Sequence, residues 1–311
     1  MTTTSAVVRR AASWNRPLIG FTAAMAVLTV VTVVGVFADD RVLTGAPIWL
    51  KPFKFAISFV LYAGTLAWML SLLPRRSRLA EWAAVTVVAT AVIEMLVIVG
   101  QVIRGQTSHF NDTTPLNTLL FNIMGGSIMV LFVAHFLVGF VVLRARLADR
   151  VSATGVRLGL GLSLLGMAAA VPMVLPTAAP PIENITGAHS VGTLDGGPGL
   201  PVVGWSTVAG DLRVGHFVGL HALQALPILA MLLTWYATRL DERTKVRLLL
   251  VAGGAYGVLT VLLTWQALRG QSLIRPDALT LTAWGALAVA TVTAAGLVLA
   301  RNRRPELALA A

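Results

Sequence analysis

Residues 101–107 read Gln-Val-Ile-Arg-Gly-Gln-Thr, and residues 266–272 read Gln-Ala-Leu-Arg-Gly-Gln-Ser. The two stretches are 165 positions apart and carry Gln, Arg, Gly and Gln at matching places. Each follows a long apolar run, so the same polar segment ends two separate predicted helices. Because a motif that recurs at a fixed separation indicates an internal repeat, the chain is predicted to consist of two related halves.

The composition indicates a membrane protein. Hydrophobic residues make up 57% of the chain and charged residues 12%, whereas a soluble domain has about 25% charged residues. The net charge of +11 does not indicate nucleic acid, because the charges fall in short clusters between apolar runs, as in membrane loops. The chain has no cysteine, which excludes disulfides, thiolate metal sites and cysteine nucleophiles. We therefore expect the lipid bilayer to be the main partner.

Eight apolar runs are each long enough to cross a bilayer, which takes about 20 residues. The sequence therefore predicts an all-α polytopic membrane protein with eight transmembrane helices. The first run is longer than the apolar core of a signal peptide, so we expect it to be retained. The predicted spans are 17–37, 48–73, 80–103, 116–143, 154–176, 214–238, 246–268 and 278–300.

Lysine and arginine predict the orientation of these spans. With the N-terminus inside, 17 of the 24 Lys and Arg residues lie on the inner side. Cytoplasmic loops carry such an excess of positive charge. We therefore expect a multi-pass protein of the plasma (inner) membrane with both termini in the cytoplasm.

The repeat predicts how the spans are organised. Spans two to four match spans six to eight at a separation near 165, and span one matches span five at a smaller separation. Four is an even number, so the two copies should be parallel four-helix repeats, covering residues 1–150 and 151–311. The second copy contains the external loop 177–213, which is rich in proline and glycine. We interpret this loop as a lid over the helix ends, and a flexible connector is the alternative.

The polar residues within the spans gather near the predicted outer side. Glu94 is the deepest charge, about 15 Å below the outer end of its span. A carboxylate at that depth must be paired or protonated, and we expect Lys54 or His221 as its partner. A structural ion pair between helices is the alternative. The candidate ligand-binding residues are Lys51, Lys54, Glu94, Gln101, Arg104, His109, Arg213, His216, His221, Gln224, Gln266 and Arg269.

Other polar residues predict either a metal site or structural contacts. His109, His216 and His221 are the candidate ligands of a metal or of haem b. His216 and His221 are five apart, so they cannot chelate one metal as an i, i+4 pair can. We expect Asp211 to cap a helix or to pair with Arg213. His135 should make a hydrogen bond between helices.

Two stretches carry a resemblance. Residues 108–111, Ser-His-Phe-Asn, and residues 216–224, His-Phe-x-Gly-Leu-His-Ala-x-Gln, resemble segments of an uncharacterised family of bacterial multi-span integral membrane proteins. This resemblance covers the outer halves of the third and sixth spans and implies no activity. The arrangement of two four-helix units is also similar to that of haem A synthase. That family's glutamate-to-histidine-arginine motif is missing here, so the similarity is one of layout.

Three functions follow from these patterns. The first is binding or transport of a small anionic or carboxylate-bearing ligand, with Glu94 and His221 coupling it to protons. The second is a membrane redox enzyme or a haem- or metal-binding protein that uses the outer histidines. The third is a non-catalytic assembly subunit in which the polar layer is structural. The sequence assigns no catalytic residue, ligand identity or oligomeric state.

Overall fold

The computed structural model describes residues 14–147, 149–175 and 186–309. It is all-helical apart from four strands of two residues each in these ranges. Eight helices in the described residues are long and apolar enough to cross a membrane. The predicted all-α class is confirmed, and each predicted span corresponds to one of these helices, whose length and composition are those of a multi-pass membrane protein.

The chain divides into two compact units, each with its own packing. The first unit comprises Met1–Arg146 and Pro172–Thr207, and the second comprises Leu147–Val171 and Val208–Ala311. The described part of the loop 177–213, which the sequence predicts to belong to the second half, thus packs largely in the first unit. Each unit is considered by itself below.

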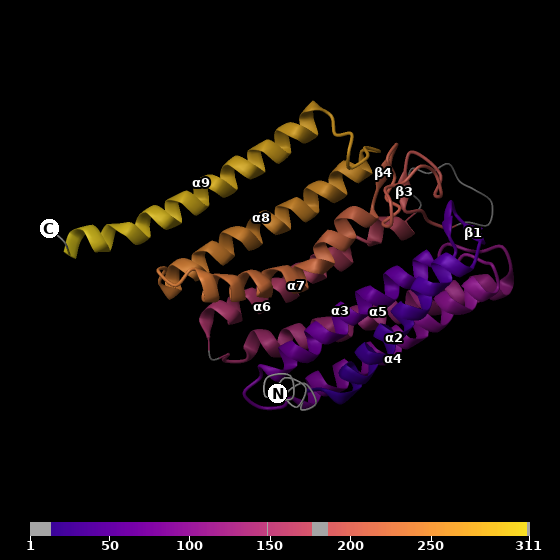
Figure 1. The fold of residues 1–311 in the computed structure, drawn as a ribbon, viewed down its shortest axis with the longest axis horizontal. Helices are drawn as coiled ribbons and strands as arrows, with labels where there is room; N and C mark the ends of the chain where they lie inside the picture. The colour runs from indigo at the N-terminus through magenta and orange to yellow at the C-terminus, as the bar shows by residue number, and fades with distance from the viewer. Residues whose placement is uncertain (1–13, 148, 176–185, 310–311) are drawn as a thin grey trace. The chain divides into compact units, whose positions relative to one another are not determined.

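In the first unit, α2 packs along α3 and α4 packs along α5, with α3 also touching α4 (Figure 1). Short connections join the helices of each pair, so the C-terminal ends of α2 and α4 lie at the same end of the unit as the N-terminal ends of α3 and α5. We call this the polar end of the first unit. The elements are α2 (Arg16–Ala38), β1 (Val42–Leu43), β2 (Ala46–Pro47), α3 (Leu50–Ser71), α4 (Arg78–Ile103), α5 (Pro115–Arg144) and β3 (Ser190–Val191).

In the second unit, α6 and α7 make the closest contact, α8 packs on both, and α9 packs along α8 (Figure 1). Glycines on α6 allow the close approach. A Cβ atom on Gly166 would lie only 2.2 Å from the backbone nitrogen of Leu220 on α7. The elements are α6 (Arg150–Ala168), β4 (Gly210–Asp211), α7 (Arg213–Tyr236), α8 (Glu242–Leu268) and α9 (Ala278–Leu309).

The fifth and eighth spans differ in extent from their predictions. α6 begins four residues before the predicted start, because Asp149 caps it by accepting hydrogen bonds from the backbone N–H groups of Val151 and Ser152. It ends at Ala168, ahead of Pro172, whose ring nitrogen cannot donate a helical hydrogen bond. Residues Val171–Val174 form a 3₁₀ helix instead. α9 continues to Leu309, past the predicted end at residue 300.

The repeated motif forms the same helix ending in both units. Gly105 and Gly270 have φ angles of 69° and 73°, a left-handed conformation that glycine adopts without steric cost. The Gly105 N–H donates to the carbonyl of Val102 at 3.0 Å, and the Gly270 N–H donates to that of Ala267 at 2.9 Å. The glutamine after each glycine donates its N–H to the carbonyl five residues earlier. These are the two hydrogen bonds of a Schellman motif, so the repeated residues terminate α4 and α8.

We predict that Gly166→Ala destabilises the protein, because the added Cβ atom would collide with the backbone of α7. Overpacking of this kind costs about 1–3 kcal/mol. Gly161→Ala on the same helix is the matched control, because a Cβ atom there would meet nothing within 4 Å. Thermal unfolding of the purified protein in detergent should show a lower midpoint for Gly166→Ala only. Equal midpoints for the two variants would contradict the close α6–α7 contact.

Candidate functional site

Glu94 lies on α4, nine residues before the helix ends at Ile103. Its side chain is 1% exposed. One carboxylate oxygen, Oε1, is 3.6 Å from Nε2 of His109. The other, Oε2, has no hydrogen-bond partner in the described part of the chain. A buried polar atom without a partner lowers stability, so its retention marks Glu94 as a candidate functional group.

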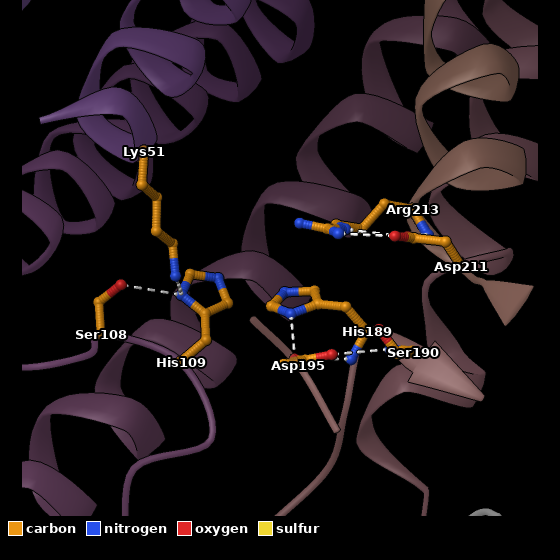
Figure 2. Close-up of polar contacts among 8 residues, drawn as sticks. All are labelled: Lys51, Ser108, His109, His189, Ser190, Asp195, Asp211 and Arg213. Atoms are coloured by element: carbon orange, nitrogen blue, oxygen red, sulfur yellow. Dashed lines mark hydrogen bonds and ion pairs between the residues drawn. The ribbon is translucent and has the colours of Figure 1, made fainter. Parts of the chain in front are cut away.

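The imidazole of His109 joins Glu94 to Lys51. Nδ1 of His109 is 3.0 Å from Nζ of Lys51 and 3.1 Å from the hydroxyl of Ser108 (Figure 2). A lysine ammonium can only donate, so Nδ1 accepts and the ring proton sits on Nε2, on the side of Glu94. The imidazole of His109 therefore lies between the ammonium group of Lys51 and the carboxylate of Glu94. We call Lys51, His109 and Glu94 the buried triad after the buried carboxylate of Glu94; Lys51 and His109 are half-buried.

A second histidine lies next to the buried triad. The ring of His189 is 6.5 Å from the ring of His109 between centroids. Nδ1 of His189 is 2.6 Å from Oδ2 of Asp195 (Figure 2). The backbone N–H groups of His189 and Ser190 also donate to Asp195, at 3.1 and 2.9 Å. Residues 186–207, here named the cover segment, thus bring a fixed imidazole–carboxylate pair to the site.

Burial by itself raises the pKa of Asp195, but the hydrogen bonds and positive charge supplied by His189, together with the contact to Ser190, outweigh it. The net pKa of Asp195 lies well below its usual range. A carboxylate with a lowered pKa stabilises the folded state above its unfolded pKa of about 3.9, and this stabilisation is lost as the pH falls further.

The cover segment is held over the polar end of the first unit by polar contacts. Nζ of Lys54 donates to the carbonyl of Val203 at 3.1 Å. The hydroxyl of Thr186 donates to Asp112 at 2.7 Å. These contacts give residues 186–207 the position that the predicted lid requires. Residues 176–185 of the predicted loop lie outside the described residues.

Backbone strain is concentrated around the same place. Among the described residues, three that are not glycine have positive φ: Thr44 at 47°, Phe110 at 58° and Val202 at 65°. All three belong to connections at the polar end of the first unit or to the cover segment. Phe110 directly follows His109, and its ring is 4.9 Å from that of His189. Strain of this kind collects at functional sites, which supports placing the candidate site here.

The expected partner of Glu94 was wrong. Lys54 donates to a backbone carbonyl of the cover segment instead. Nδ1 of His221, on α7, is 3.3 Å from the side-chain oxygen of Gln224. The group that faces Glu94 is His109, because the connection after α4 folds back over the helix end. The predicted partners were chosen by their depth along straight helices, and that calculation does not include a connection that folds back over a helix end.

The repeated Gln and Arg residues hold the ends of helices. Gln101 donates to the carbonyl of Thr107 at 3.1 Å, and Gln266 donates to that of Ser272 at 2.7 Å. Arg104 donates to the side-chain oxygens of Gln101 and Asn117, at 2.6 and 3.1 Å.

Arg269 pairs with Asp277 at 2.6 Å and donates to Thr280 at 2.8 Å. Both arginines therefore tie the end of one helix to the start of the next. This contact gives them a structural role in addition to any contact with a ligand.

The remaining candidates lie in the second unit. Arg213 pairs with the buried carboxylate of Asp211 at 2.6 Å, and its backbone N–H donates to the same carboxylate at 3.1 Å (Figure 2). The expected pairing of Asp211 with Arg213 is therefore confirmed, whereas the N-cap residue of α7 is Leu212, without a side-chain cap. Nδ1 of His216 is 2.8 Å from the carbonyl of Gly166. The charge of Arg213 is thus largely balanced within the unit.

The predictions of a metal site and of a structural role for His135 have different outcomes. The described residues contain no group of three or more His, Cys, Asp or Glu side chains that could hold a metal ion. His135 has the predicted structural role, since its Nδ1 is 2.9 Å from the hydroxyl of Tyr62 and links α5 to α3.

Sequence reasoning missed His189 and Asp195. The signal that could have found them is a histidine and an aspartate six residues apart in a loop expected to cover the site.

Comparison with known proteins gives no family. No protein-family model matches the sequence, and no curated protein or solved structure shows significant similarity to it. The function is therefore argued from the geometry of the buried triad and the cover segment.

We predict that Asp195→Asn loosens the cover segment at neutral pH, because the amide nitrogen cannot accept hydrogen bonds as the carboxylate does from His189 and Ser190. In the wild type, protection of the segment should fall as the pH drops below about 4. The difference between wild type and variant should therefore be large at pH 7 and small at acidic pH. Hydrogen exchange of peptides from residues 186–207 measures this. Asp40→Asn, at an exposed carboxylate, is the control. A difference independent of pH would contradict the assigned role of Asp195.

Proposed function

We propose that this protein transports a small anionic, carboxylate-bearing molecule across the membrane together with protons, and that Glu94 carries the proton. The observation behind this proposal is the buried carboxylate of Glu94, with one oxygen facing His109 and the other without a partner in the described residues. A carboxylate in such a place can gain or lose a proton through the imidazole without direct contact with water.

The buried triad also supplies a reason for coupling protons to an anion. When Glu94 is ionised, its negative charge offsets the positive charge of Lys51, which acts on it directly and through His109. When Glu94 takes up a proton, this balance is lost and the site becomes more positive by one charge. An anion then restores neutrality, helped by Lys54 one helical turn along α3. One proton and one negative charge therefore enter together.

The other two functional hypotheses fit the site less well. Both ring nitrogens of His109 face other groups, Lys51 and Ser108 on one side and Glu94 on the other, so the ring is poorly placed to ligate haem or a metal. A purely structural polar layer would be expected to satisfy both oxygens of a buried carboxylate, since an unmet hydrogen bond costs about 1–3 kcal/mol. The unpartnered oxygen of Glu94 therefore favours an active role.

The organisation in the membrane is part of the proposal. We propose two four-helix repeats, residues 1–150 and 151–311, in the plasma membrane with both termini in the cytoplasm. The matching Schellman endings of α4 and α8 support the repeat. The excess of Lys and Arg in the loops predicted to be inside supports the orientation. The buried triad is then reached from the outside.

We predict that Glu94→Gln abolishes proton-coupled anion uptake. Purified protein would be placed in liposomes that contain a pH-sensitive dye, and acetate, lactate, succinate and inorganic phosphate would be added in turn as probes. At least one probe should acidify the interior with the wild type, and no probe should do so with Glu94→Gln, because an amide cannot carry the proton.

Glu81→Gln is the control on the same helix. Glu81 accepts a hydrogen bond from Asn15, and the amide keeps an oxygen for this contact. This variant should transport normally. Equal proton uptake by wild type and Glu94→Gln, or no response of the wild type to any of these anions, would count against the proposal.

We predict that a cysteine at position 40 reacts with a membrane-impermeant maleimide added to intact cells, whereas a cysteine at position 75 does not. Asp40 and Arg75 are both exposed and lie at opposite ends of the first unit. The natural chain has no cysteine, so Asp40→Cys and Arg75→Cys each introduce a single thiol. Both should react once the cells are opened. The reverse pattern in intact cells would invert the proposed orientation.

A further inference from the structure

We infer that an anionic phospholipid binds to the first unit at the end opposite its polar end, with the lipid phosphate held by Arg76 and Arg78 and an acyl chain along α4. The site is an open cleft of about 320 Å³, here named the arginine cleft, which is lined by Arg76, Arg78, Glu81, Trp82 and Val85. This inference goes beyond transport, because it assigns a lipid ligand to a site that shares no residue with the buried triad.

The arginine cleft has the size and the position of a headgroup site. Its volume of about 320 Å³ is within the range of small-molecule pockets, which begins at about 300 Å³. Its lining comes from the first turns of α4 and from the connection before that helix, so the cleft lies where α4 enters the bilayer. Trp82 is 71% exposed, and tryptophan side chains gather at the level of the lipid headgroups. We therefore expect the cleft at the depth of the lipid phosphates.

The arginines of the cleft are suited to bind a phosphate. Arg76 and Arg78 are both exposed, and no ion pair in the described part of the chain includes Arg78. A guanidinium group can donate two parallel hydrogen bonds to phosphate oxygens, which an ammonium group cannot. In the orientation proposed above, the cleft faces the cytoplasmic leaflet, whose anionic lipids attract basic segments. A lipid phosphate at this depth therefore meets two groups that recognise it.

The carboxylate of Glu81 also lines the arginine cleft, and a contact with α2 holds it. It accepts a hydrogen bond from the side chain of Asn15, whose own oxygen caps α2 by accepting from the backbone N–H of Leu18. Glu81 thus joins the starts of α2 and α4. Two arginines and one glutamate leave the lining with one excess positive charge. A headgroup with a single net negative charge neutralises that excess, whereas a zwitterionic headgroup does not.

An apolar stripe continues from the cleft along α4 into the bilayer. It is formed by Trp82, Val85, Val92 and Leu96, which are 71%, 39%, 38% and 68% exposed. These residues follow one another at separations of 3, 7 and 4, so they share one face of the helix. Exposed apolar side chains within a span lie against acyl chains. The stripe therefore favours a phosphate that carries an acyl chain over a phosphate from solution.

The experiment counts the lipids bound to the purified protein in detergent by native mass spectrometry. Phosphatidylglycerol, phosphatidylethanolamine and phosphatidylcholine with the same acyl chains are titrated separately, and glycerol 3-phosphate is the soluble probe. The first phosphatidylglycerol should bind more tightly than any of the others. Its dissociation constant should rise about fivefold in Arg78→Gln and about 25-fold in the double variant Arg76→Gln/Arg78→Gln, as expected for the loss of one and two basic groups near an anionic lipid. Arg78→Lys, which keeps the charge, should bind more tightly than Arg78→Gln.

Arg75→Gln is the matched control, because Arg75 is a neighbouring exposed arginine that does not line the cleft. It should bind phosphatidylglycerol as the wild type does. The inference is overturned if Arg75→Gln weakens binding as much as Arg78→Gln does, or if phosphatidylethanolamine or phosphatidylcholine binds as tightly as phosphatidylglycerol. Equally tight binding of glycerol 3-phosphate would also overturn it, because the ligand would then be a soluble phosphate. Lipid binding is measured without anion uptake, so this inference and the transport proposal can fail separately.

Discussion

A carboxylate within a bilayer persists only where a neighbouring group compensates for its charge, and the approach of His109 to Glu94 supplies that compensation. The other features of the polar end support this contact. The connection after α4 returns over the helix end, and the left-handed backbone at Phe110 fits that path. Lys51 fixes the tautomer of His109, and His189 of the cover segment lies beside the imidazole of His109. Removal of the imidazole would leave the buried carboxylate of Glu94 without the group that faces it.

Much of the fold is predictable from apolar runs, because a segment that crosses lipid must satisfy its own backbone hydrogen bonds and is therefore a helix. The ends of the helices depend on local chemistry that run length does not contain. Asp149 caps α6, so the helix begins earlier than predicted, and Pro172 prevents it from reaching the predicted end. The repeated Gln-x-x-Arg-Gly-Gln motif was correctly recognised as a helix ending. Its detailed role as a Schellman turn with side-chain ties became visible only with the backbone conformation of Gly105 and Gly270.

The candidate site was less predictable than the fold. Glu94 stood out because charge at membrane depth is costly. Its partner, His109, comes from a connection between helices, and the path of such a connection cannot be predicted from a periodic pattern of apolar residues. His189 and Asp195 escaped notice for the same reason. The arginines illustrate the opposite difficulty. Arg213 and Arg269 suggested a site for anions, yet each pairs with an aspartate two and eight residues away along the chain. An aspartate this close along the chain can be recognised in the sequence, and it should be considered as the partner of a basic residue before a ligand is proposed.

The path of the chain has a consequence for how the protein is made. The first four spans are synthesised before α6, yet residues 172–207, which complete the first unit, follow it. During translation the buried triad therefore exists without its cover until the fifth span has been inserted and the next stretch has emerged. The two units cannot be exchanged as independent modules, because the segment that completes the first unit is encoded between the two parts of the second.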